Sequence, residues 1–257
     1  MTEPDIVRRL RAAGCVFAED EAALLIVEVD SADELERLVQ RRVAGQPLEH
    51  LLGWAEFCGL RVVVRPGVFV PRRRTELLVR LAGRLLRPGS VLLDLCCGCG
   101  AVAAALAART SIEVHAVDLE PAAVDCARQN LATVSGAVYQ GDLFDPLPTG
   151  LRGRVDVLVA NAPYVPSEAI ALMPPEAREH EPRAALDGGI DGLDIQRRII
   201  AAAPSWLAVD GRLLIETSRG QAPMTARSMA DSGLTTRTVH ARELDATGVL
   251  GTAARRG

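Results

Sequence analysis

A glycine-rich turn between acidic residues is the first feature of the chain that could bind a ligand. The segment Asp94-Leu-Cys-Cys-Gly-Cys-Gly100 follows the apolar run Val91–Leu93, and Asp118 ends the next apolar run. Glycines let the backbone approach a ligand closely, and a carboxylate at Asp118 can accept hydrogen bonds from two ribose hydroxyls. We therefore predict a nucleoside-containing cofactor here, bound by Asp94, Cys96, Gly98, Gly100 and Asp118.

The acidic side chain of Asp94 distinguishes two classes of cofactor. Gly98-x-Gly100-x-x-Ala103 also fits a dinucleotide-binding fingerprint, so a nicotinamide-dependent oxidoreductase stays as an alternative. A carboxylate repels a pyrophosphate, whereas it attracts the ammonium and sulfonium groups of S-adenosylmethionine. Asp94 therefore favours S-adenosylmethionine, with S-adenosylhomocysteine as the product.

A further acidic residue follows the next apolar pair, Val138-Tyr139. Asp142 in Gly141-Asp-Leu-Phe144 is placed to accept a hydrogen bond from the exocyclic amine of adenine. We predict that Leu143 or Leu119 flanks the adenine ring, which adds these three residues to the cofactor site.

Alternating strands and helices must position these residues. Near-continuous apolar runs at 91–94, 112–117, 138–139, 155–160 and 212–216 alternate with helical patterns, and two more strands are expected near 235–239 and 247–250. This alternation predicts an α/β fold whose parallel sheet has helices on both faces. Ligands of such sheets bind beyond the carboxyl ends of the strands, where the acidic residues described above collect.

The regions outside this alternation have other patterns. Residues 1–50 show helical spacing, and Leu60–Val64 and Val68–Val70 predict a β-hairpin that turns at Pro66-Gly67. Residues 165–192 are rich in proline and glycine, and we expect a long loop there.

Composition excludes several classes of function. The 257 residues carry a net charge of -4, and all 29 basic side chains are arginine. Without lysine there is no Schiff-base chemistry and no P-loop phosphate transfer. Mild acidity argues against direct binding of duplex nucleic acid. No apolar run is long enough to span a bilayer, so we expect no membrane association.

The cysteines and the start of the chain predict where the protein works. Residues 1–5 lack the basic and apolar stretches of a signal peptide. The cluster Cys96, Cys97 and Cys99 lacks the two separated pairs of a structural zinc site. We expect free thiols, no metal and a reducing cytoplasm.

A tetrapeptide after the strand at 155–160 resembles a known catalytic motif. Asn161-Ala162-Pro163-Tyr164 is similar to the Asn-Pro-Pro-Tyr motif of methyltransferases that act on planar, conjugated amino groups. The Asn161 side-chain carbonyl and the Ala162 backbone carbonyl can accept both hydrogens of such an amino group, which directs its lone pair at the methyl group. Tyr164 can stack on the flat group. The resemblance makes these four residues catalytic and brings Asn161 close to the cofactor.

Other segments narrow the family. Those that resemble the bacterial release-factor glutamine methyltransferases are Gln46–Gly53, Glu56–Leu60, Val70–Glu76, Glu181–Leu193 and Glu216. They occur in the same order from about residue 40 to about residue 250. The resemblance implies a Rossmann-like, seven-stranded methyltransferase sheet whose last strands are antiparallel.

The resemblance also implies the reaction and its partner. The acceptor would be the glutamine side-chain nitrogen in the Gly-Gly-Gln loop of a translation release factor, with Arg72, Glu181, Pro182 and Glu216 binding this substrate. We expect a monomer with a helical substrate-recognition domain at 1–50, a β-hairpin linker at 51–75 and an S-adenosylmethionine-dependent methyltransferase domain at 76–257.

The chain departs from the family pattern at several positions. Ala162 replaces a proline, Cys96 replaces a glycine, and Pro71-Arg-Arg-Arg-Thr-Glu76 replaces Pro-Arg-Pro-Glu-Thr-Glu. The helical N-terminal domain is also shorter than usual, and we expect a divergent subgroup. The alternatives are a methyltransferase of adenine or cytosine in nucleic acid, one of another protein or small amide, and a cofactor-binding protein without activity.

Overall fold

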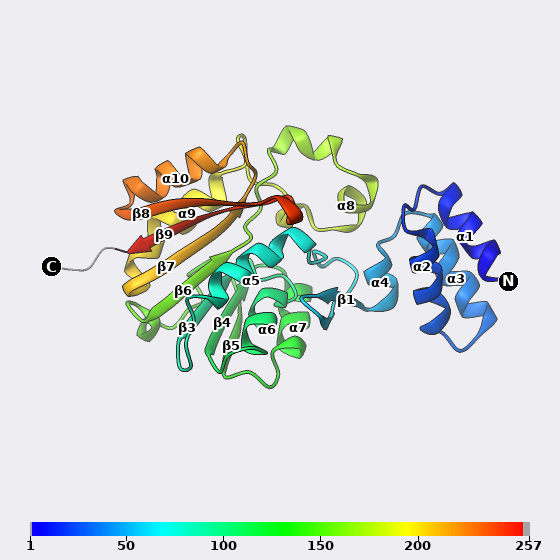
Figure 1. The fold of residues 1–257 in the computed structure, drawn as a ribbon, viewed down its shortest axis with the longest axis horizontal. Coiled ribbons are helices and arrows are strands. Elements are labelled where there is room, and N and C mark those ends of the chain that lie inside the picture. Colours follow the sequence, from blue (N-terminus) through cyan, green and yellow to red (C-terminus); the bar gives the residue numbers. More distant parts are fainter. Residues whose placement is uncertain (1, 254–257) are drawn as a thin grey trace.

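The N-terminal region is a small helical domain at one end of the molecule (Figure 1). The computed structural model describes residues 2–253. The domain consists of α1 (Glu3–Ala12), α2 (Ala18–Val27), α3 (Ala32–Val43) and α4 (Leu48–Leu52). The helices enclose their own apolar cluster, which includes Ile6, Leu10, Leu25 and Val39. The helical pattern of the first 50 residues is therefore present in the structure.

A buried ion pair ties the helices of this domain together. Arg42 on α3 donates from Nε to Glu21 on α2 over 2.6 Å, and both side chains are about nine-tenths buried. Arg42 also lies 3.6 Å from Glu176, which belongs to the segment that follows β6. This contact links the N-terminal domain to the larger sheet-containing domain, which begins at α5 (Glu76–Gly83).

The hairpin lies earlier in the chain than its sequence pattern indicates. β1 (Trp54–Phe57) pairs with β2 (Leu60–Val63), so the predicted pairing across Pro66-Gly67 is wrong. Cys58 and Gly59 both have positive φ, at 53° and 80°, and form the two-residue turn that closes an antiparallel hairpin. Asn130 fixes the hairpin to the larger domain, because its side chain bonds both the N–H and the carbonyl of Val63.

A seven-stranded sheet forms the centre of the larger domain (Figure 1). Its strands are β3 (Val91–Leu95), β4 (Glu113–Asp118), β5 (Gly136–Gln140), β6 (Val155–Ala160), β7 (Leu207–Thr217), β8 (Leu234–Ala241) and β9 (Ala246–Ala253). The spatial order is β5-β4-β3-β6-β7-β9-β8, with β9 antiparallel to both of its neighbours and the other pairs parallel. The Rossmann-like α/β fold with an antiparallel C-terminal pair is confirmed.

Helices cover both faces of the sheet. α5 (Glu76–Gly83), α6 (Ala101–Ala107) and α7 (Pro121–Asn130) pack on one face, while α9 (Asp194–Ala202) and α10 (Ala222–Asp231) pack on the other. Leu92 and Leu93 illustrate the alternation, because these neighbours on β3 belong to opposite apolar clusters. Among residues 2–253, no helix is long and apolar enough to cross a membrane.

The segment 165–192 is more ordered than a long loop. It contains the short helices η3 (Ser167–Leu172), α8 (Pro175–His180) and η4 (Arg183–Ala185). Prolines stand at or just before the first residue of each, where a missing N–H costs nothing. The prolines that suggested a loop therefore begin helices. Other short helices are η1 (Arg73–Thr75), η2 (Thr149–Leu151), η5 (Ala203–Ser205) and η6 (Arg242–Leu244).

Candidate active site

A cavity of about 520 Å³ opens beyond the carboxyl ends of β3, β4 and β6. The predicted site residues that line it are Arg72, Asp94, Cys96, Gly98, Asp118, Leu119, Asp142, Leu143, Asn161, Ala162, Pro163, Tyr164, Glu181 and Glu216. Gly100 and Pro182 are not part of this lining. A Cβ at Gly100 would lie 3.2 Å from the side chains of Ala127 and Leu131, so this glycine allows close packing of α7 instead.

Two carboxylates form the acidic part of the wall. Asp94 is 3% exposed, and burial raises its pKa to about 7, with the charge of Asp118 adding to the effect. The Ala103 backbone N–H, 3.2 Å from Asp94 Oδ2, opposes this shift. Burial also raises the pKa of Asp118. A cation placed here would stabilise both charged forms.

Asp118 shapes the glycine-rich turn as well as facing the cavity. Its Oδ2 accepts from the Gly98 backbone N–H over 2.8 Å, and its Oδ1 accepts from the Glu120 N–H over 3.0 Å. Each carboxylate oxygen has a second lone pair. Asp118 can therefore brace the turn and still accept hydrogen bonds from a ligand.

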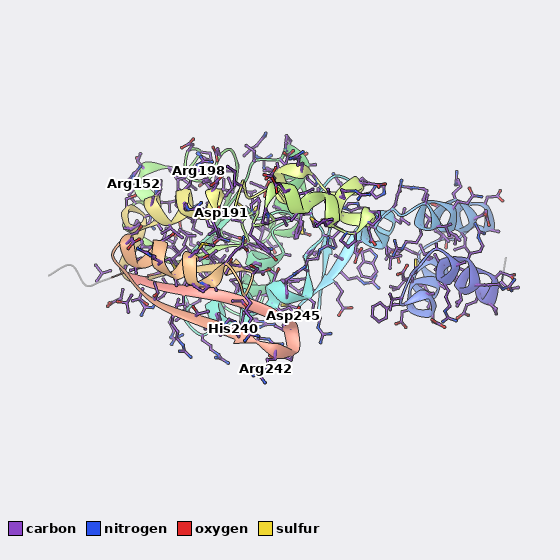
Figure 2. All side chains as sticks on the ribbon, turned by 90° about the horizontal axis from the view of Figure 1, so that it is seen from above. Arg152, Asp191, Arg198, His240, Arg242 and Asp245 are labelled. Atoms are coloured by element: carbon purple, nitrogen blue, oxygen red, sulfur yellow. The ribbon has the colours of Figure 1, made fainter. Side chains whose placement is uncertain are left out.

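The predicted adenine region is built from residues after β4 and β5. Asp142 forms an ion pair with Arg198 on α9 over 2.7 Å. Figure 2 labels Arg198 in the part of the molecule away from the N-terminal helices. Leu143 is buried and adopts a positive φ of 49°, whereas Leu119 is largely exposed. Arg198 could not be found from the sequence, because nothing in its local pattern marks a partner for Asp142.

The tetrapeptide begins where β6 ends, beside β7. Ala160, the last residue of β6, pairs with Ile215 of β7, so Asn161 lies beside Glu216, the last residue but one of β7. The Asn161 amide nitrogen donates to the Thr75 hydroxyl over 3.3 Å. Tyr164 lies near Glu216, and burial, with the charge of Glu216 adding to the effect, raises the pKa of its phenol to about 12. Burial also raises the pKa of Glu216 to about 7.

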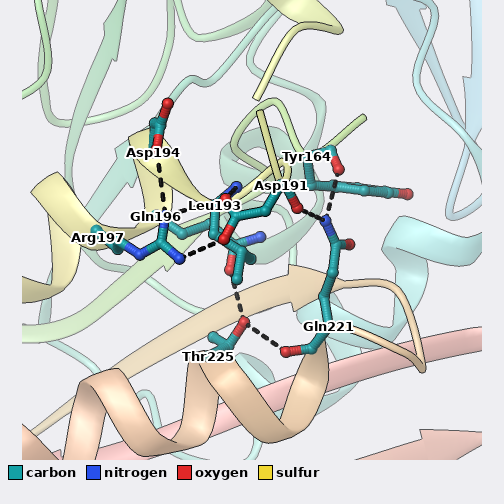
Figure 3. Close-up of polar contacts among 8 residues, drawn as sticks. All are labelled: Tyr164, Asp191, Leu193, Asp194, Gln196, Arg197, Gln221 and Thr225. Carbon is teal, nitrogen blue, oxygen red and sulfur yellow. Dashed lines mark hydrogen bonds and ion pairs between the residues drawn. The ribbon is translucent and has the colours of Figure 1, made fainter. Parts of the chain in front are cut away.

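The end of the tetrapeptide is braced by Gln221, which precedes α10, and by the segment before α9. Gln221 donates from Nε2 to the carbonyl oxygens of Tyr164 and Asp191, over 2.9 and 3.0 Å (Figure 3). Gly192 has a φ of 77°, and a Cβ there would lie 2.3 Å from the Tyr164 carbonyl oxygen. Only glycine allows so close an approach to the Tyr164 carbonyl. This contact explains why a glycine stands at position 192 within the segment Glu181–Leu193.

A buried glutamate closes another side of the cavity. Glu181 Oε1 accepts from Arg72 over 2.6 Å and from the Val70 backbone N–H over 3.1 Å. Its Oε2 is buried with no hydrogen-bond partner, and burial raises the pKa of the carboxyl. An N–H group of a bound ligand would satisfy this oxygen.

Several lining residues were missed by the sequence reasoning. Those with the largest or most polar side chains are Phe57, Phe69, Arg74, Thr75, Met173, Glu176 and Ile195. Phe57, Arg74 and Thr75 stand inside segments that carried the family resemblance, which could have drawn attention to them. Of the others, Phe69 follows the hairpin, Met173 and Glu176 belong to α8 and its approach, and Ile195 belongs to α9. The local patterns of these segments give no sign of a site.

The described part of the chain contains no group of three or more His, Cys, Asp or Glu side chains that could hold a metal ion. The six cysteines at 15, 58, 96, 97, 99 and 126 are free thiols. Cys96 takes a positive φ of 55° at the position where the family has glycine.

Comparison with known proteins shows which family this chain resembles. Residues 59–174 match the methyltransferase small domain. The release factor glutamine methyltransferase of Geobacter sulfurreducens is 43% identical over 188 residues, which are 72% of this chain and 65% of that protein. The one of Mycolicibacterium smegmatis is 39% identical over 220 residues, covering 83% of this chain and 78% of that protein.

Solved structures support the fold. A methyltransferase from Pyrococcus furiosus is 16% identical with a TM-score of 0.58, covering 76% of this chain and 90% of that one. A ribosomal protein L11 methylase from Lactobacillus delbrueckii is 18% identical with a TM-score of 0.54, covering 75% and 84%. On the sequence relatives and the shared fold together, this chain belongs to the release factor glutamine methyltransferase family.

Proposed function

We propose that the protein transfers a methyl group from S-adenosylmethionine to the side-chain nitrogen of a protein glutamine, in the Gly-Gly-Gln loop of a release factor. The observation that carries this proposal is the position of Asn161 and Ala162. Both line the same cavity as the buried acid Asp94, so an amide acceptor and a cationic donor can meet there. The family's curated relatives carry the same activity in their names.

The residues around the cavity fit S-adenosylmethionine. A volume of about 520 Å³ lies within the usual range for cofactor sites. Asp94 and Asp118 are carboxylates whose raised pKa values a cation and ribose hydroxyls would lower again. We assign binding of the adenine to Asp142, Leu143 and Leu119. We assign the cofactor contacts of the glycine-rich turn to Cys96 and Gly98. When bound, the cofactor supplies an electrophilic methyl group.

The tetrapeptide would orient the acceptor. Amide nitrogens are poor nucleophiles because the lone pair is delocalised. Asn161 Oδ1 and the Ala162 carbonyl accept the two N–H hydrogens and so stabilise the positive charge that develops on nitrogen. The N–C bond forms as the S–C bond breaks, and the product loses its proton to water. Pro163 and Tyr164 form the flat wall against which the amide lies.

Polar groups elsewhere in the cavity would hold the peptide around the glutamine. Glu181 and Glu216 each have one buried oxygen without a partner. We assign these oxygens to N–H groups of the substrate loop, with Arg72 holding Glu181 in place and Pro182 fixing the turn beside it. The helical domain at 1–50 and the linker at 51–75 would contact the rest of the release factor, and the domain at 76–257 would carry out catalysis.

Methyl transfer to purified macromolecules tests this function. Separate reactions each contain the protein, labelled S-adenosylmethionine and one kind of acceptor, which is the host's release factors, total RNA or DNA. Label on a release factor supports the proposal. Label on nucleic acid alone, or tight binding of NADH without binding of S-adenosylmethionine, would overturn it. We also expect a cytoplasmic monomer, which fractionation and light scattering can check.

A further inference from the structure

One side chain holds the backbone of the tetrapeptide where it leaves the sheet. β6 ends at Ala160, which is still paired with both neighbouring strands. Among residues 2–253, no backbone-to-backbone hydrogen bond involves residues 162–164. The Tyr164 carbonyl oxygen accepts instead from Gln221 Nε2, over 2.9 Å. This bond therefore fixes the part of the tetrapeptide that the sheet no longer fixes.

Gln221 also binds the turn that lies against the tetrapeptide. Its Nε2 donates to the Asp191 carbonyl oxygen over 3.0 Å, and Figure 3 shows this amide between Asp191 and Tyr164. The turn at 188–192 approaches closely because it contains glycines. A Cβ at Gly188 would lie 2.7 Å from the Pro163 carbonyl oxygen. Gln221 thus fastens two irregular segments to each other.

The orientation of the Gln221 amide follows from the partners around it. Backbone carbonyl oxygens can only accept hydrogen bonds, so the NH₂ group of the amide must face them. On the other side, Oε1 accepts from the Ser218 hydroxyl over 2.6 Å, and that hydroxyl accepts from the Gln221 backbone N–H over 3.2 Å. Gln221 is 8% exposed, so water competes little for these bonds. The side chain is therefore held in one orientation.

The composition of the tetrapeptide makes this bond important. Pro163 has a fixed φ and restricts the preceding Ala162 to extended conformations. Ala162 stands where the resembled family has a proline, so no ring fixes its own φ. The bond from Gln221 to the Tyr164 carbonyl limits the movement that this alanine permits.

We propose that Gln221 is a positioning residue that holds the tetrapeptide so that the Ala162 carbonyl faces the methyl acceptor. Gln221 is not part of the cavity lining, and it acts through the Tyr164 carbonyl. The role of Ala162 rests on the function proposed above, whereas the hold on the backbone does not. A displaced tetrapeptide would still let the cofactor bind, so Gln221 acts on turnover.

Kinetics of two variants test this role. Gln221→Met keeps the length of the side chain and removes its donors. Gln221→Asn keeps an amide but withdraws it by one methylene, and it should fold because asparagine is favoured at the N-cap of a helix, which Gln221 occupies in α10. We expect both variants to lower kcat roughly 10- to 100-fold, with little change in the Kd of S-adenosylmethionine. Wild-type kcat in both variants would overturn the proposal.

A second buried glutamine, Gln196, provides the matched control (Figure 3). It is 1% exposed, and its amide donates to the Glu216 carbonyl and accepts from the Thr225 hydroxyl. These hydrogen bonds go to β7 and α10 rather than to the tetrapeptide. Gln196→Met should therefore lower the unfolding temperature by about as much as Gln221→Met and leave kcat nearly unchanged. An equal loss of kcat in both variants would show that Gln221 is only a structural residue.

A spectroscopic readout needs no acceptor. The chain has two tyrosines, Tyr139 and Tyr164, so tyrosine with an isotope-labelled carbonyl carbon gives two NMR signals, which Tyr164→Phe assigns. The Tyr164 signal should move in both Gln221 variants and stay in place in Gln196→Met, with Tyr139 on β5 as the internal control. An unmoved Tyr164 signal in both Gln221 variants would contradict the hold on the backbone. A signal that moves in a protein that methylates no release factor would contradict only the proposed function.

Discussion

Asp94 is the last residue but one of β3 and Asp118 ends the neighbouring parallel strand β4, and the charge of Asp118 adds to the burial that raises the pKa of Asp94 to about 7. Two acids so placed repel each other until a cation lies between them or near them. Without a nearby cation the pair of carboxylates is therefore electrostatically unfavourable, and the proposed cofactor would relieve the repulsion. The pH dependence of cofactor affinity and the pH dependence of folding stability should both reflect this repulsion.

Affinity for S-adenosylmethionine should rise with pH. The ionised form of Asp94 attracts the cationic cofactor, and its protonated form does not. Between about pH 6 and pH 8 we expect the Kd to fall by up to about tenfold. Asp94→Asn should bind more weakly, with a Kd that changes less over this range. Calorimetric titrations measure both, and a pH-independent Kd in the wild type would contradict the assigned role of Asp94.

The folding stability of the cofactor-free protein should fall as pH rises, which is opposite to the trend in cofactor affinity. The unfolded chain ionises Asp94 near pH 3.9, so between that pH and about 7 the folded state binds more protons. The contribution of Asp94 to folding stability therefore falls as pH rises through this window. At pH 8 Asp94→Asn should be more stable than wild type, on the order of 2 kcal/mol. The difference should vanish below about pH 4, as urea unfolding can show.

Asp118→Ala should weaken cofactor binding. The variant loses the acceptors proposed for the ribose and the brace on the Gly98 N–H. Loss of hydrogen bonds to a charged group is worth about 1.5 to 3 kcal/mol, or roughly 10- to 100-fold in Kd. Asp125→Ala on the exposed face of α7 is the control and should bind normally. If the two variants bind S-adenosylmethionine equally well, Asp118 does not belong to the site.

Gly192→Ala should damage catalysis more than cofactor binding. A methyl group there would lie 2.3 Å from the Tyr164 carbonyl oxygen and 2.4 Å from Gln221 Nε2, at a φ of 77°. The tetrapeptide must then shift, and shifts of about 1 Å can reduce turnover about 100-fold. Gly220→Ala meets no atom within 4 Å and serves as the control. Unchanged kcat in Gly192→Ala would show that this brace is dispensable.

The buried ion pair of the N-terminal domain gives a stability prediction. Glu21→Ala leaves the nearly buried Arg42 without its main partner, although Glu176 lies 3.6 Å away. We expect a loss of about 3 kcal/mol of unfolding free energy. Glu36→Ala breaks the more exposed pair with Arg9 and should lower the unfolding free energy much less, because solvent screens that pair. Equal losses in chemical unfolding would contradict this assignment.

The sequence was informative where one local pattern determines one local structure. Val155–Ala160 is the strand that the apolar run indicates, and Asp94, Asp118 and Asn161 stand at strand ends because apolar runs stop there. The hairpin was misplaced because a Cys58-Gly59 turn gives a weaker signal than Pro66-Gly67, although it is Cys58 and Gly59 that take the left-handed conformation closing the hairpin.

Local sequence patterns could not predict contacts between segments that are distant in the chain. Arg198 reaches Asp142 across 56 residues, and Thr75 reaches Asn161 across 86. Such partners follow from packing of α9 and α5 on the sheet, which periodicity does not specify. The family resemblance marked the segment that contains Thr75 but could not say which of its atoms meets the tetrapeptide.

The central claim is that Asn161 orients a protein glutamine for methylation. The direct test is mass mapping of the host's release factor after incubation with S-adenosylmethionine and either wild type or Asn161→Ala. The account predicts one methyl group on the glutamine of the Gly-Gly-Gln loop with wild type. With Asn161→Ala it predicts almost none, although the Kd of the cofactor changes little. A methyl group on any other residue, or undiminished methylation by Asn161→Ala, would contradict it.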